Sequence, residues 1–265
     1  MVGAAINAFA ESEIPCGVKL LFTADEETGW KGAGQLVQQL SLQEEVIGIV
    51  VGEPTANVPA IGHKGGLYLK VTTSGKTAHS SMPHLGENAI YKAARAILKA
   101  EQFDFNVVED DLLGFSTINV GRMQGGLNLN SVPDYAEFTI DARTTTKIKH
   151  SELLERLQND FGREVQIEVL VDLPAVASSE DSQFVQSVYS ACGIVRGTAG
   201  YPRSLPYLTD GAVLQSAYKG APTVILGPGQ PELAHKTDEF CYIDKIEQAV
   251  EIYKKIIITG GGYNG

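Results

Sequence analysis

The stretch around which the chain is organised is Leu20-Leu21-Phe22-Thr23-Ala24-Asp25-Glu26-Glu27-Thr28-Gly29, an apolar run that ends in three acids and a glycine. Apolar β-forming residues bounded by turn residues predict a buried strand at residues 18–24, with the acids projecting into the crevice at its end. Neighbouring side chains of an extended segment point in opposite directions, so Glu26 and Glu27 share one environment only if the backbone turns between them. The alternative is a solvated acidic loop, which this stretch alone does not exclude.

Helices alternate with apolar strands around this stretch. We expect helices at residues 3–12 and 31–40 and a second strand at residues 46–52. Strands that are apolar on both faces and alternate with helices indicate a parallel sheet covered on both sides. The second strand also ends in an acid, Glu53. Because ligands bind beyond the carboxyl ends of such strands, we expect Glu26, Glu27 and Glu53 to gather at the edge of the sheet where the strands end, which we call the rim.

The pattern changes after about residue 59. The next expected elements follow the order β-α-β-β-α-β, at residues 66–74, 86–101, 115–123, 135–143, 150–160 and 165–171. This order is the split ferredoxin-like arrangement. A complete unit of this kind between α/β segments indicates an inserted domain, so we assign residues 60–173 to it and residues 1–59 and 174–265 to the two parts of the α/β domain.

The helix–strand alternation resumes after residue 174. We expect helices at 180–192, 210–218 and 243–258, with strands near 194–198 and at 222–226. The loop after the last strand is rich in glycine and polar residues and contains His235. It should reach the same rim as the acids. The tail at 260–265 is expected to be disordered.

Composition excludes several classes of protein. The 265 residues carry a net charge of −11, which argues against nucleic acid as a partner because phosphates would be repelled. The three cysteines have no paired spacing, so we expect free thiols in a reducing cytoplasm. No apolar run approaches ~20 residues and the start lacks signal-peptide features, so no membrane association is expected.

The rim residues are suited to a metal. Carboxylates from two strand ends and the His235 imidazole suit zinc, cobalt or manganese better than calcium. Crowded acids need a cation to offset their repulsion, and one acid left unligated can act as general base. Each residue also has a plainer interpretation, since Glu53 can stabilise a turn before Pro54 and His235 can be a surface histidine.

Four motifs in order carry a resemblance to a known family. They are Ala24-Asp25-Glu26-Glu27-Thr28-Gly29, Val51-Gly52-Glu53-Pro54-Thr55, the run from Gly75 to Ala89 that contains Ala78-His79-Ser80-Ser81-Met82-Pro83, and Ala234-His235-Lys236-Thr237-Asp238-Glu239. This set resembles the dinuclear-zinc aminoacylase and carboxypeptidase family, which includes acetylornithine deacetylase and succinyl-diaminopimelate desuccinylase. The resemblance covers essentially the whole chain.

The resemblance implies a metal-dependent hydrolase of an N-acyl amino acid or short peptide. It implies two metal ions, Zn²⁺ or Co²⁺ or Mn²⁺, with Glu26 as the general base. Glu27 and His235 correspond to ligands of one ion and Glu53 to a ligand of the other. The inserted domain of the family forms a homodimer and supplies a histidine to the scissile oxyanion across the interface, and His79 matches that histidine.

Four further residues resemble substrate contacts of the family. Asn130 and Arg143 match residues that contact the substrate carboxylate, although Arg143 can also be an ordinary strand-end cation. Gly227 and Gly229 would let the loop backbone approach the substrate closely. The remaining histidines, His63, His84 and His150, we interpret as structural or surface residues.

One part of the family pattern is not in the sequence. Family members carry, upstream, a strand ending in His-x-Asp and then an Asp that bridges the two metals before a helix that resembles Met1-Val2-Gly3-Ala4-Ala5. The resemblance therefore places a histidine ligand and the bridging Asp before residue 1. We expect this chain to bind metal poorly and to show little activity. The alternative function is a non-catalytic dimerising remnant of the same fold, whereas a nucleotide-binding protein is disfavoured because no phosphate-binding glycine motif follows the first strand.

Overall fold

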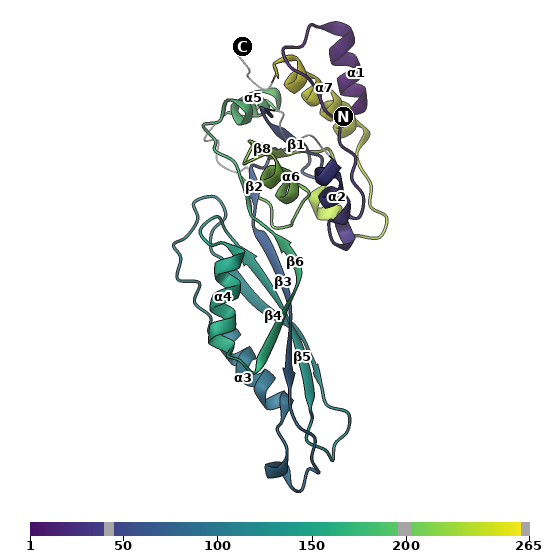
Figure 1. The fold of residues 1–265 in the computed structure, drawn as a ribbon. Helices are drawn as coiled ribbons and strands as arrows, with labels where there is room; N and C mark the ends of the chain where they lie inside the picture. Colours follow the sequence, from purple (N-terminus) through teal and green to yellow (C-terminus); the bar gives the residue numbers. More distant parts are fainter. Residues whose placement is uncertain (40–44, 196–202, 261–265) are drawn as a thin grey trace. The chain divides into compact units, whose positions relative to one another are not determined.

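The computed structural model describes residues 1–39, 45–195 and 203–260, and the chain divides into two units (Figure 1). Unit 1 consists of Met1–His63 and Val176–Gly265, and unit 2 consists of Lys64–Ala175. Unit 2 is thus one continuous piece of chain inserted into unit 1. Each unit has its own secondary structure and core.

Unit 1 combines helices with short strands. Its helices are α1 (Val2–Glu11), α2 (Lys31–Gln39), α5 (Gln183–Ala191), α6 (Gly211–Ala217) and α7 (Ile243–Ile258), and its strands are β1 (Ile49–Val51), β2 (Gly62–His63), β7 (Val176–Ala177) and β8 (Thr223–Ile225). Strand β1 runs parallel to β8, and β2 runs antiparallel to β7. The parallel pair and its helices confirm the α/β class. The antiparallel pair β2–β7 was not predicted, because strands of two residues leave no periodic signal.

The core of unit 1 is centred on strand β8. All three of its residues are buried, and Leu226 just beyond it is also buried. Helix α1 packs against α7 through alanines, Ala4, Ala5 and Ala8, all of which are buried. Small side chains on the contact face allow the two helices to approach closely. Among the described residues, no helix is both long and apolar enough to cross a membrane.

The strand predicted at residues 18–24 is wrong. These residues have no regular secondary structure, and Leu20 and Phe22 are 37% and 74% exposed. A strand needs a neighbour that takes its backbone hydrogen bonds, and the described parallel sheet consists of β1 and β8 alone. Without such a neighbour, an apolar run does not become a strand.

Other predicted boundaries of unit 1 differ from the structure. Strand β1 starts at Ile49 rather than at residue 46, and a Cβ on Gly48 would lie 2.2 Å from the Phe184 ring. Helix α5 thus packs closely against Gly48, directly before the residues of β1 that pair with β8. Ile194 and Val195 are not in a strand, while the remainder of the strand predicted near 194–198 lies outside the described residues. The last residue of the helix predicted at 31–40 and the tail at 261–265 also lie outside them.

Unit 2 has the predicted order β-α-β-β-α-β. Its elements are β3 (Gly65–Ser74), α3 (Ala89–Glu101), β4 (Thr117–Gly125), β5 (Tyr135–Thr144), α4 (His150–Phe161) and β6 (Val165–Leu173). They form one sheet with the strand order β4-β5-β3-β6, antiparallel throughout. Helices α3 and α4 lie on the same side of this sheet (Figure 1). The ferredoxin-like prediction is therefore confirmed.

The core of unit 2 lies between the helices and the sheet. Alternate residues of β3 and β5 are buried, including Leu67, Leu69, Phe138 and Ile140, whereas their neighbours face the open side. Helix α4 contributes Leu153, which is fully buried. This alternation is the period-2 pattern of a sheet with one covered face.

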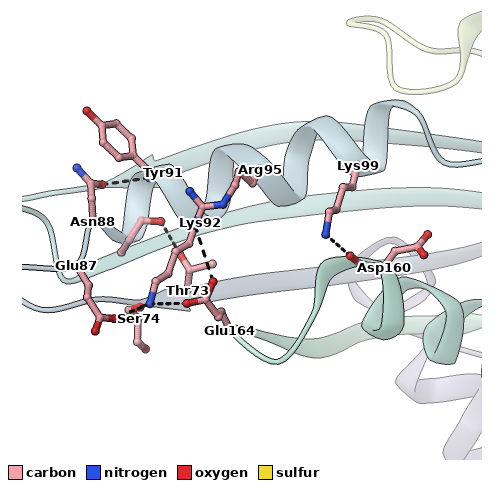
Figure 2. Close-up of polar contacts among 11 residues, drawn as sticks. Thr73, Ser74, Glu87, Asn88, Tyr91, Lys92, Arg95, Lys99, Asp160 and Glu164 are labelled. Carbon is pink, nitrogen blue, oxygen red and sulfur yellow. Dashed lines mark hydrogen bonds and ion pairs between the residues drawn. The ribbon is translucent and has the colours of Figure 1, made fainter.

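Helix α3 begins at Ala89 rather than at residue 86, because Asn88 is its N-cap. The Asn88 side chain accepts a hydrogen bond of 3.1 Å from the Tyr91 backbone N–H (Figure 2). Lys92 ties the first turns of the helix to its surroundings, since its ammonium donates to the Ser74 carbonyl and forms ion pairs with Glu87 and Glu164. A side-chain cap and ion pairs thus fix the start of α3.

Truncating Leu153 should destabilise unit 2. We expect Leu153→Ala to cost about 2–5 kcal/mol, because it leaves a cavity between α4 and the sheet. Urea unfolding followed by far-ultraviolet circular dichroism measures the loss. Leu170→Ala is the matched control, since Leu170 is 50% exposed on β6 and its truncation should cost far less. Equal losses in the two variants would contradict the assigned core.

Candidate active site

The first acidic loop turns between its two glutamates. Glu26 and Glu27 begin a single 3-10 turn, Glu26–Thr28, between Asp25 at φ 70° and Gly29 at φ 131°. Trp30 closes the loop, because its backbone N–H donates to the Asp25 carbonyl at 2.9 Å and its indole Nε1–H donates to Glu26 Oε1 at 3.0 Å. The turn gives the two carboxylates different surroundings: Glu26 is partly buried and Glu27 is exposed.

Glu53 lies in the loop that follows β1. This loop is bonded to the loop after β8, since the Thr55 backbone N–H and hydroxyl both donate to the Gly227 carbonyl, at 3.2 and 3.3 Å. The Gly227 N–H in turn donates to Thr55 Oγ1 at 3.1 Å. Glu53 is therefore held beside the glycine-rich loop that leads to His235.

The substrate approach predicted at Gly227 and Gly229 stays a prediction, and both positions also have a packing reason to be glycine. A Cβ on Gly227 would lie 2.4 Å from the Glu53 carbonyl oxygen, and one on Gly229 would lie 2.9 Å from the Pro54 Cβ. Any side chain at either position would separate the two strand-end loops. These glycines thus allow the two loops of the rim to lie in direct contact.

His235 arrives from the third loop. It lies just after a 3-10 turn, Pro231–Leu233, and has φ 61°. Its Nε2 is 3.7 Å from Glu27 Oε1, and both side chains are well exposed. The structure thus brings together Glu27 and His235, the two residues predicted to hold one ion.

The acids at the rim perturb one another. Burial and the Glu27 charge raise the pKa of Glu26. Burial and the charges of Glu26, Asp210 and Glu27 raise the pKa of Glu53 to about 7. These carboxylates are close enough to repel one another, and a bound cation or bound protons would offset this repulsion.

Asp210 is a rim residue that the sequence analysis missed. It precedes helix α6, is 6% exposed, and accepts a hydrogen bond of 2.5 Å from the Thr23 hydroxyl. Burial raises its pKa. An Asp before a helix usually indicates an N-cap, and nothing in the local sequence distinguishes this one from a cap.

The donor types at the rim fit zinc or a similar ion, but their arrangement is incomplete. Within the described residues, no three His, Cys, Asp or Glu side chains converge as a metal site would require. Glu27 and His235 form a pair of donors, whereas a catalytic zinc ordinarily has three protein ligands. The predicted ligands thus lie near one another without forming a closed coordination shell.

His79 and Asn130 belong to unit 2 and lie on neighbouring segments. His79 is bridged to Ser131, and the Ser80 N–H donates to the Asn130 carbonyl at 3.0 Å. The Ser81 backbone N–H donates to His79 Nδ1 at 3.2 Å. A nitrogen that accepts a hydrogen bond from a backbone N–H carries no proton, so the neutral ring has its proton on Nε2.

Arg143 already has partners within unit 2. Its guanidinium donates to both carboxylate oxygens of Asp141, at 2.7 and 3.0 Å, and stacks on the Tyr68 ring with 5.2 Å between the charge and the ring centre. The remaining N–H groups of its fork keep further donor capacity. The substrate contact predicted for Arg143 stays a prediction.

The other histidines differ in environment. His63 is fully buried, with Nε2 3.1 Å from Thr209 Oγ1, as expected of a structural residue. His150 lies between Asp172 and Thr144, at 2.6 and 2.7 Å. That arrangement imitates a nucleophile triad, but Thr144 is 1% exposed and cannot reach a substrate.

An α/β unit with an inserted β-α-β-β-α-β unit is an architecture that this chain shares with known proteins. A sequence model described as a peptidase dimerisation domain matches residues 61–167. The acetylornithine deacetylase of Myxococcus xanthus is 29% identical over 268 residues, covering 96% of this chain and 67% of that protein. A probable succinyl-diaminopimelate desuccinylase of Staphylococcus epidermidis is 28% identical over 273 residues, covering 90% and 66%.

Solved structures share the fold. An M20 family metallo-carboxypeptidase of Sulfolobus solfataricus has a TM-score of 0.73 at 18% identity, covering 98% of this chain and 74% of that one. A dinuclear metal binding peptidase of the M20 family from Bacillus subtilis has a TM-score of 0.70 at 17% identity, covering 98% and 69%. The chain thus has the fold of these M20 family structures, and its inserted unit matches the peptidase dimerisation domain. It spans about two thirds of the length of the curated relatives it matches.

The raised pKa of Glu53 predicts a pH-dependent stability of the metal-free protein. At pH values between 4.5, the ordinary pKa, and about 7, the folded chain holds a proton that the unfolded chain has released. The stabilisation from this group is thus complete at low pH and is lost as the pH rises through 7. We expect the Tm, measured with a chelator present, to fall between about pH 5 and about pH 8.

Glu53→Gln should reduce this fall, because an amide does not ionise. Glu251→Gln removes the same charge from an exposed position on α7 and serves as the control. A Tm profile of Glu53→Gln identical to that of the unaltered chain would contradict the assignment.

Proposed function

We propose that the protein is a metal-dependent amidohydrolase that hydrolyses an N-acyl amino acid, of the deacetylase or desuccinylase type, or a short peptide. The observation that carries the proposal is that Glu26, Glu27, Glu53 and His235, from three loops far apart in sequence, lie near enough to interact electrostatically. The names of the relatives agree with this reaction class. Unit 1 would be catalytic and unit 2 would mediate dimerisation.

Glu27 and His235 would hold one ion and Glu53 would contribute to a second. Zn²⁺, Co²⁺ or Mn²⁺ suits these donors. A bound ion of this kind would polarise the scissile carbonyl and offset the repulsion among the acids. Because the described residues bring together only one pair of donors, we expect weak binding and a need for added metal.

Glu26 would act as the general base. Its raised pKa brings the carboxylate closer to the range in which proton transfer is efficient near neutral pH. The indole of Trp30 holds one carboxylate oxygen, so the other is free to take a proton from the attacking water and pass it to the leaving amine.

Unit 2 would supply the remaining contacts. His79, with its proton on Nε2, is suited to donate a hydrogen bond to the developing oxyanion. Asn130, on the neighbouring segment, and Arg143 would bind the substrate carboxylate. The loop backbone at Gly227 and Gly229 would border the substrate from unit 1.

A homodimer through unit 2 is the proposed assembly. Strand β4 is an edge of the sheet and its backbone hydrogen-bonding groups are available to another strand. Met123 on β4 and two residues of the adjacent helix α3, Tyr91 and Leu98, are apolar and 43–66% exposed. Strand β6, at the opposite edge, also exposes apolar residues, Val169 and Leu170, but the exposed residues of α4 beside it are polar. We favour the β4 edge for a second copy because its helix α3 adds the exposed Tyr91 and Leu98.

The alternative is a non-catalytic dimerising protein of the same fold. It is favoured by the incomplete donor set and opposed by the presence of Glu26, of the Glu27–His235 pair and of His79, which match the residues that the reaction would need. The two functions differ in a single measurement, hydrolysis in the presence of added metal.

Glu26→Gln tests the catalytic proposal. With added Zn²⁺ or Co²⁺, we expect hydrolysis of N-acetylornithine or an N-succinyl amino acid, and a loss of about 10²–10⁴ in kcat in the variant. Metal content measured by mass spectrometry should be the same in both proteins, because Glu26 is not assigned as a ligand. No hydrolysis by the unaltered chain at any metal concentration would favour the non-catalytic alternative.

Charges on the β4 edge test the dimer. Light scattering should give about twice the chain mass of 28.4 kDa for the unaltered protein and a single chain mass for Leu98→Glu/Met123→Lys. Val169→Lys on the opposite edge strand β6 is the control and should leave the dimer intact. A dimer that survives the double substitution would place the interface elsewhere.

A further inference from the structure

Asp210 occupies the N-cap position of α6 without acting as a cap. Its side chain makes no capping hydrogen bond, and the Gly211 N–H instead donates to Thr209 Oγ1 at 3.1 Å. Helix stability therefore does not explain the carboxylate. Its side chain instead contacts Thr23, 187 residues away in the sequence.

The two oxygens of Asp210 have different environments. Oδ2 accepts the Thr23 hydroxyl at 2.5 Å. Oδ1 is buried and has no hydrogen-bond partner among the described residues. Burying an unpaired carboxylate oxygen is unfavourable. The charge of Asp210 also raises the pKa of both Glu26 and Glu53, so the carboxylate repels its neighbours at the rim.

Unit 2 contains a matched pair for comparison. Asp110 is also 6% exposed and also accepts a threonine hydroxyl, that of Thr146. Its Oδ1, however, accepts the backbone N–H groups of Leu112 and Leu113, both at 3.0 Å. Burial raises the pKa of both acids, but in Asp110 the Thr146 hydroxyl and the two backbone N–H groups outweigh it and lower the pKa, whereas the pKa of Asp210 stays raised. Asp110 is thus a satisfied structural residue, while Asp210 is retained despite an unfavourable position.

The Thr23 contact explains what Asp210 contributes. Residues 18–25 have no regular secondary structure, and the Thr23 hydroxyl bond to Asp210 is one of the contacts that hold this approach to the acids. A Cβ on Gly32, in the first turn of α2, would lie 2.0 Å from the Ala24 carbonyl, which shows how closely this segment meets α2. Helix α6 packs against both α2 and β1, the strand that leads to Glu53. The bond from Thr23 to Asp210 therefore links the segment before the first acidic loop to the helix that packs against β1.

We propose that Asp210 is a positioning residue: by accepting the Thr23 hydroxyl, it holds Glu26 at the distance from Glu53 that the reaction needs. The inference rests on the proposed function of Glu26. The role is exerted through Thr23 and the backbone of residues 23–26, without contact between Asp210 and the substrate.

Trp30 provides a test that does not depend on turnover. It is the only tryptophan of the chain, and its indole N–H donates to Glu26. A ¹⁵N-labelled protein therefore has one indole N–H resonance, whose shift reports the Trp30–Glu26 hydrogen bond. We expect Thr23→Val and Asp210→Ala to shift this resonance, and their combination to shift it no further than either alone.

One conservative variant and one control variant complete the test. Thr23→Ser keeps the hydroxyl and should restore the original resonance. Thr146→Val breaks the matched pair in unit 2 and should leave the resonance unmoved. In the kinetic assay, Thr23→Val and Asp210→Ala should each lower kcat by about tenfold to a hundredfold with little change in KM, because the base is displaced while substrate contacts remain.

An unmoved resonance in both Thr23→Val and Asp210→Ala would overturn the inference, as would a shift of the same size in Thr146→Val. These outcomes are independent of the catalytic proposal, which fails only if Glu26→Gln leaves hydrolysis unchanged or if no hydrolysis occurs. An indole shift without hydrolysis would support positioning of Glu26 while rejecting its use as a base.

Discussion

The hydrogen bonds between the loop after β1 and the loop after β8 are the contact on which the rim depends. Thr55 binds the Gly227 carbonyl and N–H, and the absence of a side chain at Gly227 lets the two backbones touch. Parallel pairing of β1 and β8 alone would bring the strand ends to one edge. The hydrogen bonds between the loops keep the chain segments close beyond the ends of the strands, so Glu53 lies beside the loop that leads to His235.

Unit 2 could be predicted from the sequence because its signals are local. The alternation of β3 and β5 and the helical spacing of α3 and α4 each identify an element without reference to the rest of the chain. The strand at residues 18–24 failed for the opposite reason. Its apolar run meets the same local criterion, but strand formation depends on a pairing partner that a window of sequence does not reveal.

The candidate site was predictable in the same uneven way. Glu26, Glu27, Glu53 and His235 could be named because each follows a strand or lies in a recognisable loop motif. Asp210 could not, since its local sequence is that of a helix cap and its significance comes from Thr23, far away in the chain. Residues defined by tertiary contacts alone leave no periodic or motif signal.

The rim also illustrates how a site can work against the stability of its own fold. Glu26, Glu53 and Asp210 are all partly or largely desolvated acids with raised pKa values. A fold selected for stability alone would replace at least one of them with a neutral side chain. The cation binding that we propose for this surface would offset the repulsion among these acids.

The way unit 2 is inserted has a consequence for the order of folding. Its two connections to unit 1 run through β2 and β7, which are hydrogen-bonded neighbours, so the ends of the insertion meet. Unit 2 is continuous in sequence and can form first. Once formed, it spares unit 1 the closure of a loop of roughly a hundred residues, an entropy saving on the order of 4 kcal/mol. An insertion that folds first would thus bring β1 and β8, which precede and follow it in the sequence, close together before they pair.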